Sequence, residues 1–77
     1  MNDRITIDPH ICHGQPCFKN SRIMVYLVLE LVEAGLSADV IIRDYYPSLT
    51  KEDIQSAIHY AVMLIKNEEY IPYEGVV

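Results

Sequence analysis

The chain has 77 residues, 51% hydrophobic and 22% charged, with 3 Gly and 4 Pro, a composition typical of one small globular domain rather than a disordered segment. Its longest uninterrupted apolar run, Ile23–Leu29, is followed by Glu30 and falls far short of the roughly 18 apolar residues of a membrane span. Six Lys and Arg against eleven Asp and Glu give a net charge of -5, which argues against broad, charge-driven binding to nucleic acid but leaves room for a local basic patch.

That charge is unevenly distributed along the chain. Residues 1–24 carry three basic and two acidic side chains, a net +1, so residues 25–77 hold the remaining -6. No basic start or small-residue cleavage site frames an early apolar stretch, so we expect a soluble, cytoplasmic protein. Ordering 77 residues costs on the order of 100 kcal/mol, which a core this small barely offsets. Because two cysteines make a poor disulfide framework, we expect a metal or oligomerisation to add stability.

The N-terminal part predicts a small β element. Alternation of polar and apolar residues over Arg4–Asp8 predicts a half-buried strand that Pro9 ends. After an irregular loop, Cys17–Phe18 and Arg22–Met24 are expected to pair as a hairpin across Lys19–Ser21, because Asn20 tolerates the left-handed backbone of a tight turn.

A first helix is predicted from Val25 to Ala34, with Gly35 as its C-terminal stop. Only Tyr26, Glu30 and Glu33 form a polar stripe, so its apolar surface is wider than one core-facing side requires. We therefore expect a homodimer in which a second copy covers part of this helix. The candidate interface residues are Val25, Leu27, Val28, Leu29, Leu31 and Val32.

Two further helices are predicted, over residues 38–45 and 51–66. Ser37 is a suitable N-cap for the first, which Pro47 stops near Tyr45, and Thr50 with Asp53 forms a shortened capping box for the second. The core-facing side of the longer helix follows a 3, 4 and 7 spacing: Ile54, Ala57, Ile58, Ala61, Leu64 and Ile65. The expected fold is thus a single α+β domain: a β element over 1–24, a three-helix, helix-turn-helix-like bundle over 25–67 and an extended tail over 68–77.

This order of motifs resembles the family called domain of unknown function 433 (DUF433), from Ile5 to about Ala61. The matching positions are Gly14, Pro16, Ser21, Arg22 and Ile23 in the hairpin, Gly35-Leu36-Ser37 at the helix break, and Tyr46-Pro47, Leu49-Thr50, Asp53-Ile54, Ala57-Ile58 and Tyr60-Ala61 in the later helices. The chain departs from the family pattern at Asn20, where glycine is usual, and at Ser21, where threonine is usual. The resemblance implies a small dimeric helix-turn-helix protein, and for some members an antitoxin whose toxin is a PIN-like ribonuclease.

Four potential metal ligands, His10, Cys12, His13 and Cys17, lie within eight residues. A structural zinc site usually joins two separate knuckles, and one short loop wraps a tetrahedron poorly. We therefore expect no metal or cofactor, with the cysteines as small buried residues and the histidines in a solvated loop. Cysteine catalysis needs a base positioned beside the thiolate, and the closeness of His13 and Cys17 in sequence does not establish that geometry. We therefore predict no catalytic residues and no enzymatic activity.

A helix-turn-helix would place the start of the 51–66 helix in a DNA major groove. Gln55 can read adenine and Lys51 can reach phosphate, whereas the nearby Glu52, Asp53 and Asp44 repel the backbone. A dimer would add cations around the groove, including Arg4. The candidate DNA-binding residues are Lys51, Gln55, Ser56, His59, Arg43, Lys19 and Arg22.

Taken with the family resemblance, which alone implies the antitoxin role and the PIN-like ribonuclease, the sequence predicts an antitoxin-like module that binds DNA as a dimer, neutralises such a ribonuclease, or does both. The alternative is a protein-interaction or dimerisation module that does not bind DNA. In that case the tail could present Tyr70, Ile71, Tyr73 and Val76 to a partner, by adding a strand to a sheet edge or by filling apolar pockets.

Overall fold

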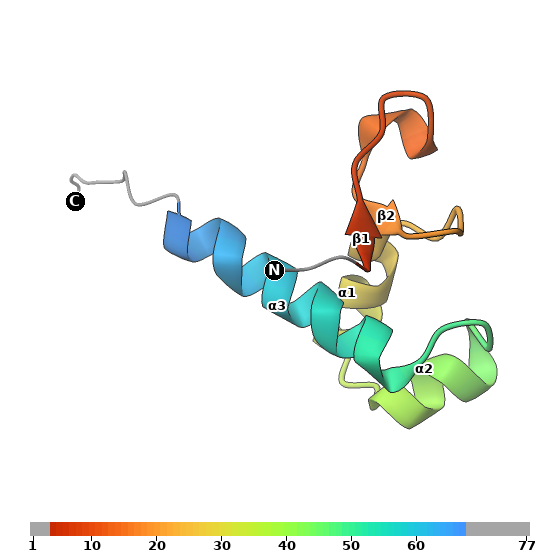
Figure 1. Ribbon diagram of the computed structural model, residues 1–77. Helices are drawn as coiled ribbons and strands as arrows, with labels where there is room; N and C mark the ends of the chain where they lie inside the picture. The colour runs from red at the N-terminus through yellow and green to blue at the C-terminus, as the bar shows by residue number, and fades with distance from the viewer. Residues whose placement is uncertain (1–3, 68–77) are drawn as a thin grey trace.

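The computed structural model describes residues 4–67, which form a small β element followed by three helices, as predicted (Figure 1). The predicted tail, residues 68–77, lies outside the described residues. No helix within residues 4–67 combines the length and apolar character needed to cross a bilayer. The elements in chain order are β1 (Ile5–Thr6), the 3-10 turn η1 (Cys12–Gly14), β2 (Cys17–Phe18), α1 (Val25–Glu33), α2 (Ala38–Asp44) and α3 (Lys51–Asn67).

The sheet joins the two short strands in antiparallel register, with Ile5 opposite Phe18 and Thr6 opposite Cys17. The expected pairing of residues 17–18 with 22–24 is reduced to an isolated bridge between Cys17 and Met24. It stops there because Val25 already begins α1, and its N–H donates to the carbonyl of Pro16 at 2.9 Å. The predicted strand over residues 4–8 is likewise shorter, since β2 offers only two residues for pairing.

A single cluster of buried apolar side chains joins every part of the described chain except η1. Phe18 contributes from β2, and the helices close around it. Both α2 and α3 contact α1, and α2 also contacts α3. Burial of aliphatic and aromatic side chains of this kind is the main source of stability in a small domain. The buried residues are Cys17, Phe18, Val25, Val28, Ile41, Leu49, Ile54 and Ala57.

More of the α1 surface packs against its own chain than the homodimer prediction assumed. Val25 and Val28 are 2% and 0% exposed within a single chain, so they present little side-chain surface to a second copy. Leu29, Leu31 and Val32 are half-buried and pack against the same cluster. The two strands supply part of this cover, because Phe18 of β2 and Ile5 of β1 pack in the same cluster. These five aliphatic residues of α1 therefore pack within their own chain. Leu27, the sixth predicted interface residue, is half-buried as well.

Local capping chemistry sets the helix ends much as predicted. Gly35 adopts φ +94, its N–H donates to the carbonyl of Val32 at 2.9 Å, and that of Leu36 donates to Leu31 at 3.1 Å. This pair of bonds is a Schellman motif, which ends α1. The Ser37 hydroxyl accepts from the N–H of Val40 at 3.3 Å and begins α2.

The start of α3 is held by a reciprocal capping box. The N–H of Asp53 donates to Thr50 Oγ1 at 3.2 Å, and the N–H of Thr50 donates to Asp53 Oδ2 at 2.9 Å. The other carboxylate oxygen of Asp53 accepts from Arg4 at 3.2 Å. One side chain therefore both caps α3 and ties it to the residue before β1.

The predicted core-facing stripe of α3 is only half covered. Ile54 and Ala57 are buried and Ile58 and Ala61 half-buried, whereas Leu64 and Ile65 are exposed. The prediction was wrong for the last two because α3 extends beyond the elements that pack against its beginning (Figure 1).

We expect Thr50→Ala to lower the free energy of unfolding by about 1 kcal/mol, because it removes the hydroxyl that accepts from the N–H of Asp53. For a domain of this size, that loss lowers the thermal midpoint by roughly 4–8 °C. Ser48→Ala is the matched control, since Ser48 is exposed in the same turn and outside the capping box. Equal midpoints for the two variants would show that the Thr50 hydroxyl contributes nothing to stability.

We also expect the two cysteines to differ in alkylation rate. Burial raises the pKa of the Cys17 thiol, and the neighbouring Cys12 thiol raises it further, so less of the reactive thiolate is present at a given pH. Cys12 is only half-buried. With iodoacetamide near pH 8, peptide mass spectrometry should find Cys12 modified first in the folded protein and both modified at similar rates in denaturant. Prior modification of Cys17 in the folded protein would contradict its placement.

Candidate functional site

The most distinctive polar feature of the surface is the turn that connects β2 to α1. The N–H of Ser21 donates to the carbonyl of Phe18 at 3.1 Å, which closes a four-residue turn. Asn20 occupies its third position with φ +63, a left-handed conformation that asparagine tolerates better than most residues. The turn predicted at this place is therefore confirmed, with Asn20 able to serve where the related family usually has glycine.

Ser21 fixes the shape of this turn with its side chain. Its hydroxyl donates to the carbonyl of Phe18 at 2.8 Å and accepts from the N–H of Ile23 at 3.1 Å. Both directions of hydrogen bonding are thus used within the chain. We conclude that Ser21 positions its neighbours, Asn20 and Arg22, rather than offering a free group to a ligand.

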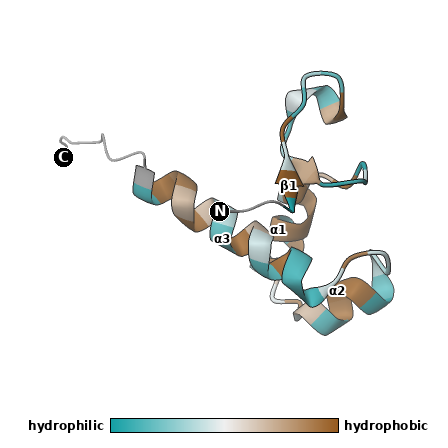
Figure 2. Cartoon of the chain, in the orientation of Figure 1, coloured by the Kyte–Doolittle hydropathy of each residue, from teal (hydrophilic) through white to brown (hydrophobic). Residues whose placement is uncertain are grey.

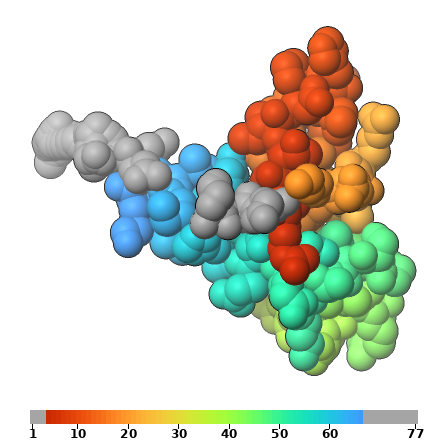
Figure 3. All heavy atoms as spheres, viewed as in Figure 1, coloured from red at the N-terminus to blue at the C-terminus, as the bar shows by residue number. Residues whose placement is uncertain are grey.

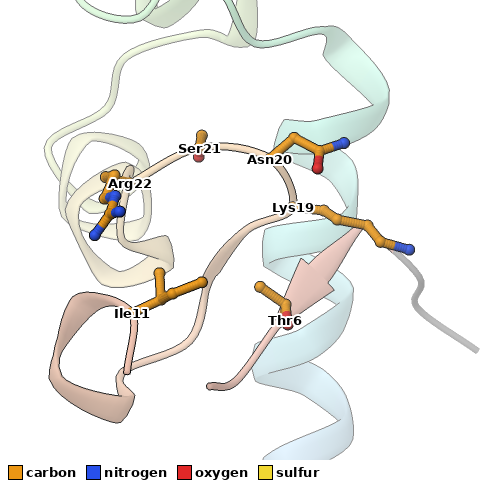
Figure 4. Close-up of a pocket in the computed structure, with 6 residues that line it drawn as sticks. All are labelled: Thr6, Ile11, Lys19, Asn20, Ser21 and Arg22. Carbon is orange, nitrogen blue, oxygen red and sulfur yellow. The ribbon is translucent and has the colours of Figure 1, made fainter. Parts of the chain in front are cut away.

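A hollow of about 370 Å³ lies beside the turn (Figure 4). Figure 4 shows Thr6 and Ile11 between the side chains of Lys19 and Arg22, which extend toward opposite sides. The site therefore presents two positive charges flanking a polar and partly apolar surface, rather than two cations that converge on one point. The lining residues are Thr6, Ile11, Lys19, Asn20, Ser21 and Arg22.

Lys19 and Arg22 are also distinguished by what they do not contact. Within residues 4–67 neither side chain forms an ion pair, whereas Arg4, Arg43 and Lys51 each contact a carboxylate. Among residues 4–24 the only carboxylate is that of Asp8. The positive charge of this part of the chain is therefore available at the turn.

The predicted DNA-reading face lies along the start of α3. Lys51, Gln55 and His59 are exposed at successive i, i+4 positions, and Ser56 is half-buried beside them. However, the ammonium of Lys51 is 3.2 Å from Asp39 Oδ1. The segment between α2 and α3 covers residues 45–50, longer than the three or four residues of a typical helix-turn-helix turn.

Arg43, the remaining cation predicted for this face, is held by its sequence neighbour. Its Nε donates to Asp44 Oδ1 at 2.8 Å, and a terminal nitrogen donates to Oδ2 at 3.0 Å. These bonds lower the pKa of the Asp44 carboxyl and raise the pKa of the Arg43 guanidinium. The structure therefore places the predicted cations in two groups, with Arg43 and Lys51 neutralised by aspartates and Lys19 and Arg22 together at the hollow.

The four potential metal ligands near η1 are used differently. The Cys12 thiol is 3.5 Å from the carbonyl of Arg22, and the Cys17 thiol is 3.8 Å from that of Ser21. His10 and His13 are exposed. Within the described part of the chain, no three His, Cys, Asp or Glu side chains are grouped so that they could hold one ion. The thiols instead approach the backbone of the turn that carries Lys19.

A second surface was not predicted from the sequence. Four consecutive residues near the end of α3, Val62–Ile65, are all exposed, and a groove of about 300 Å³ between α1 and α3 lies beside them. The length of the predicted helix could have revealed this surface. A 16-residue helix that packs against two shorter helices leaves part of its own length uncovered. Figure 2 shows the hydrophobic character of α3 continuing toward its C-terminal end.

Comparison with known proteins gives the family. A family model described as "Protein of unknown function (DUF433)" matches residues 5–61. The chain is also similar to the crystal structure of a DUF433 member protein from Anabaena variabilis ATCC 29413, with a TM-score of 0.73 and 31% sequence identity. That match covers 84% of this chain and 63% of the other chain, which is therefore the longer protein. No protein with a curated description matches. From the family match and the shared fold, we conclude that this chain belongs to the DUF433 family.

Proposed function

We propose that this protein is an antitoxin-like nucleic-acid-binding module that contacts the phosphate backbone of DNA through the turn between β2 and α1. The observation that carries the proposal is the pair Lys19 and Arg22, which flank one hollow and form no ion pair within residues 4–67. The antitoxin part of the proposal, with a PIN-like ribonuclease as the toxin, comes from the family resemblance.

The spacing of the two cations favours an extended polyanion over a single phosphate. Lys19 and Arg22 extend to opposite sides of the hollow, so one small anion in its centre would not contact both head groups well (Figure 4). Consecutive phosphates along a nucleic-acid strand instead present charge at intervals across such a surface. Thr6, between the cations, adds a hydroxyl donor of the kind that contacts phosphate and sugar oxygens.

The acidic remainder of the protein limits this binding to a small area. The net charge of -5 repels DNA at long range, and Asp39 and Asp44 neutralise the cations of the helical face. We therefore assign the backbone contacts to the turn, with few phosphates neutralised by each chain. Such binding is moderate in strength and falls as salt is added.

The second candidate function is protein interaction without DNA. It is favoured by the exposed apolar run Val62–Ile65, because soluble monomers rarely expose contiguous apolar patches of this kind without a binding role. The two candidate functions differ in the affinity for DNA that they predict. A purely protein-binding module has no affinity for DNA above that of a nonspecific control, even at low salt.

We expect a fluorescently labelled duplex from the DNA upstream of the protein's own gene to bind in an anisotropy titration. With about two phosphate contacts per chain, raising salt from about 50 to about 200 mM should weaken binding roughly tenfold. The double variant Lys19→Gln/Arg22→Gln should lose most of the affinity and reduce the salt slope by about 2. Lys66→Gln/Lys51→Gln is the matched control, since it removes the same charge outside the hollow. Equal losses in the two double variants would refute the assignment to the turn.

We expect Gln55→Ala to leave the affinity for this duplex unchanged, because the exposed Glu52 and the capping carboxylate of Asp53 oppose close approach of DNA to the start of α3. The measurement is the same titration with the specific duplex and with a scrambled duplex. A loss of about 1–3 kcal/mol on the specific duplex alone would instead place α3 at the base edges, as the helix-turn-helix reading requires.

A further inference from the structure

The two cysteines of the chain adjoin one another beneath the turn that carries Lys19. The thiol of Cys12 is a hydrogen-bond partner of the Cys17 thiol. Both sulfurs also contact carbonyls of the turn, Cys12 that of Arg22 at 3.5 Å and Cys17 that of Ser21 at 3.8 Å. Both are free thiols. Two thiols are thus held together against the segment that positions the two cations of the hollow.

The two thiols differ in accessibility. Cys12 is half-buried, so a small reagent can reach its sulfur. Cys17 is 0% exposed, so it reacts readily only with a group already held beside it. Burial raises the pKa of the Cys17 thiol, the Cys12 thiol raises it further, and the Arg22 guanidinium opposes that rise. An accessible thiol beside a protected one is the arrangement of an attacking and a resolving cysteine.

The backbone at Cys12 is strained. Cys12, His13 and Gly14 have consecutive positive φ angles of +53, +56 and +79. Only the glycine adopts this left-handed region without steric cost, because the other two residues carry a β-carbon. Strained residues of this kind cluster at functional sites and in segments that switch conformation. A backbone change at Cys12 therefore has strain to release.

The core does not hold this segment in place. The buried cluster and the residues packed on it come from β1, β2, the three helices and the turns between them, but not from η1. The backbone hydrogen bonds of η1 are local, between residues 8 and 15. Figure 3 shows the red-orange segment that contains η1 projecting from the helices. Cys12 can therefore move toward Cys17 without disturbing the buried cluster.

We propose that Cys12 and Cys17 form a reversible disulfide by exchange with a low-molecular-weight disulfide, and that this bond reshapes the hollow between Lys19 and Arg22. The inference adds regulation to the site of the proposed function, and it rests on that function for its effect on DNA binding. Formation of the bond depends only on the chemistry of the two thiols.

The exchange takes two balanced steps. Cys12 loses its proton to water, and its thiolate attacks one sulfur of the reagent; the other half of the reagent leaves as a thiolate and takes up a proton. Cys17 then attacks the Cys12 sulfur of this mixed disulfide, and its proton passes to the second half of the reagent, which leaves as a thiol. The cysteines lose two hydrogen atoms and two electrons, and the reagent is reduced to two thiols.

The disulfide acts on the hollow from two sides. Ile11 lines the hollow and directly precedes Cys12, so movement of Cys12 displaces one wall. Oxidation also consumes both S–H groups, so the carbonyls of Ser21 and Arg22 lose their thiol donors. These carbonyls belong to the segment that positions the two cations. We therefore expect the oxidised protein to hold Lys19 and Arg22 less firmly and to bind a polyanion more weakly.

The same geometry makes the bond reversible. A link between residues 12 and 17 closes a short loop, so it gains little from chain entropy, and it replaces two existing contacts of the thiols. The Cys12 sulfur stays accessible to an external thiol. Strained or exposed disulfides are the labile and regulatory ones, in contrast to the buried structural bonds of secreted proteins.

The bond is tested with the full chain in glutathione buffers. After incubation in about 5 mM oxidised glutathione near pH 8, the denatured protein should accept no alkylating reagent, and after dithiothreitol it should accept two equivalents. Intact mass should show the loss of two hydrogen atoms, and peptide mapping should link residues 12 and 17. Two free thiols, a stable glutathione adduct or a link between chains would each overturn the proposal.

Two variants separate the roles of the cysteines. Cys17→Ala should stop at the mixed disulfide, with glutathione retained on Cys12, because no resolving thiol remains. Absence of this adduct in a variant whose circular dichroism shows intact helices would refute the attacking role of Cys12. Cys12→Ser keeps a hydroxyl that can donate to the Arg22 carbonyl but cannot form a disulfide.

The effect on the hollow is tested by duplex titration in oxidising and reducing buffer. The wild type should lose most of its affinity on oxidation and regain it with dithiothreitol, whereas Cys12→Ser should bind equally in both. Equal wild-type affinities in the two buffers, or the same loss in Cys12→Ser, would refute the link between the disulfide and the cations.

The redox proposal and the proposed function fail in different ways. A disulfide that forms in a protein without affinity for duplex in either state would reject nucleic-acid binding alone. The hollow is then followed by NMR: the amide resonances of residues 19–23 should shift on oxidation and those of α2 should not, and unshifted turn resonances would overturn the reshaping. Duplex binding by a protein that forms no disulfide would reject the redox pair alone.

Discussion

The burial of α1 within its own chain is the constraint on which the other features depend. Phe18 from the hairpin, Ile41 from α2 and Ile54 from α3 join Val25 and Val28 in one cluster, so a nine-residue helix is covered from several directions. With so few fully buried side chains, this domain can lose none of them cheaply; removing a large one typically costs 2–5 kcal/mol. Most of the exposed apolar surface of the helices therefore lies at the distal end of α3, with Tyr26 as the exposed aromatic residue of α1.

The basic side chains also differ between elements in whether they are paired with carboxylates. The helical region neutralises its cations with nearby aspartates, through the pairs Arg43–Asp44 and Lys51–Asp39. These exposed pairs contribute little to stability, but they remove positive charge from the face that a helix-turn-helix would present to DNA. The hairpin keeps Lys19 and Arg22 available. The protein thus has a cationic surface and an apolar surface on different elements, which allows the two to act at the same time.

Features set by local chemistry could be predicted from the sequence, because they depend on a few adjacent residues. The Asn20 turn, the end of α1 at Gly35 and the caps at Ser37 and Thr50 are of this kind. Features that depend on contacts between distant segments could not be predicted from the sequence. The pairing of β2 with β1, the cover over Val25 and Val28, and the engagement of Lys51 by Asp39 all depend on where remote segments come to lie. The periodicity of α3 identified an apolar stripe correctly but carried no information about how far its cover would extend.

The two oxygens of Asp53 have a consequence for the order of assembly. One caps α3 and the other contacts Arg4, 49 residues earlier in the chain. A ladder of two residues per strand is too short to persist alone in water. Because Arg4 contacts Asp53 across 49 residues, this contact of the N-terminal segment can form only after the start of α3 has been synthesised.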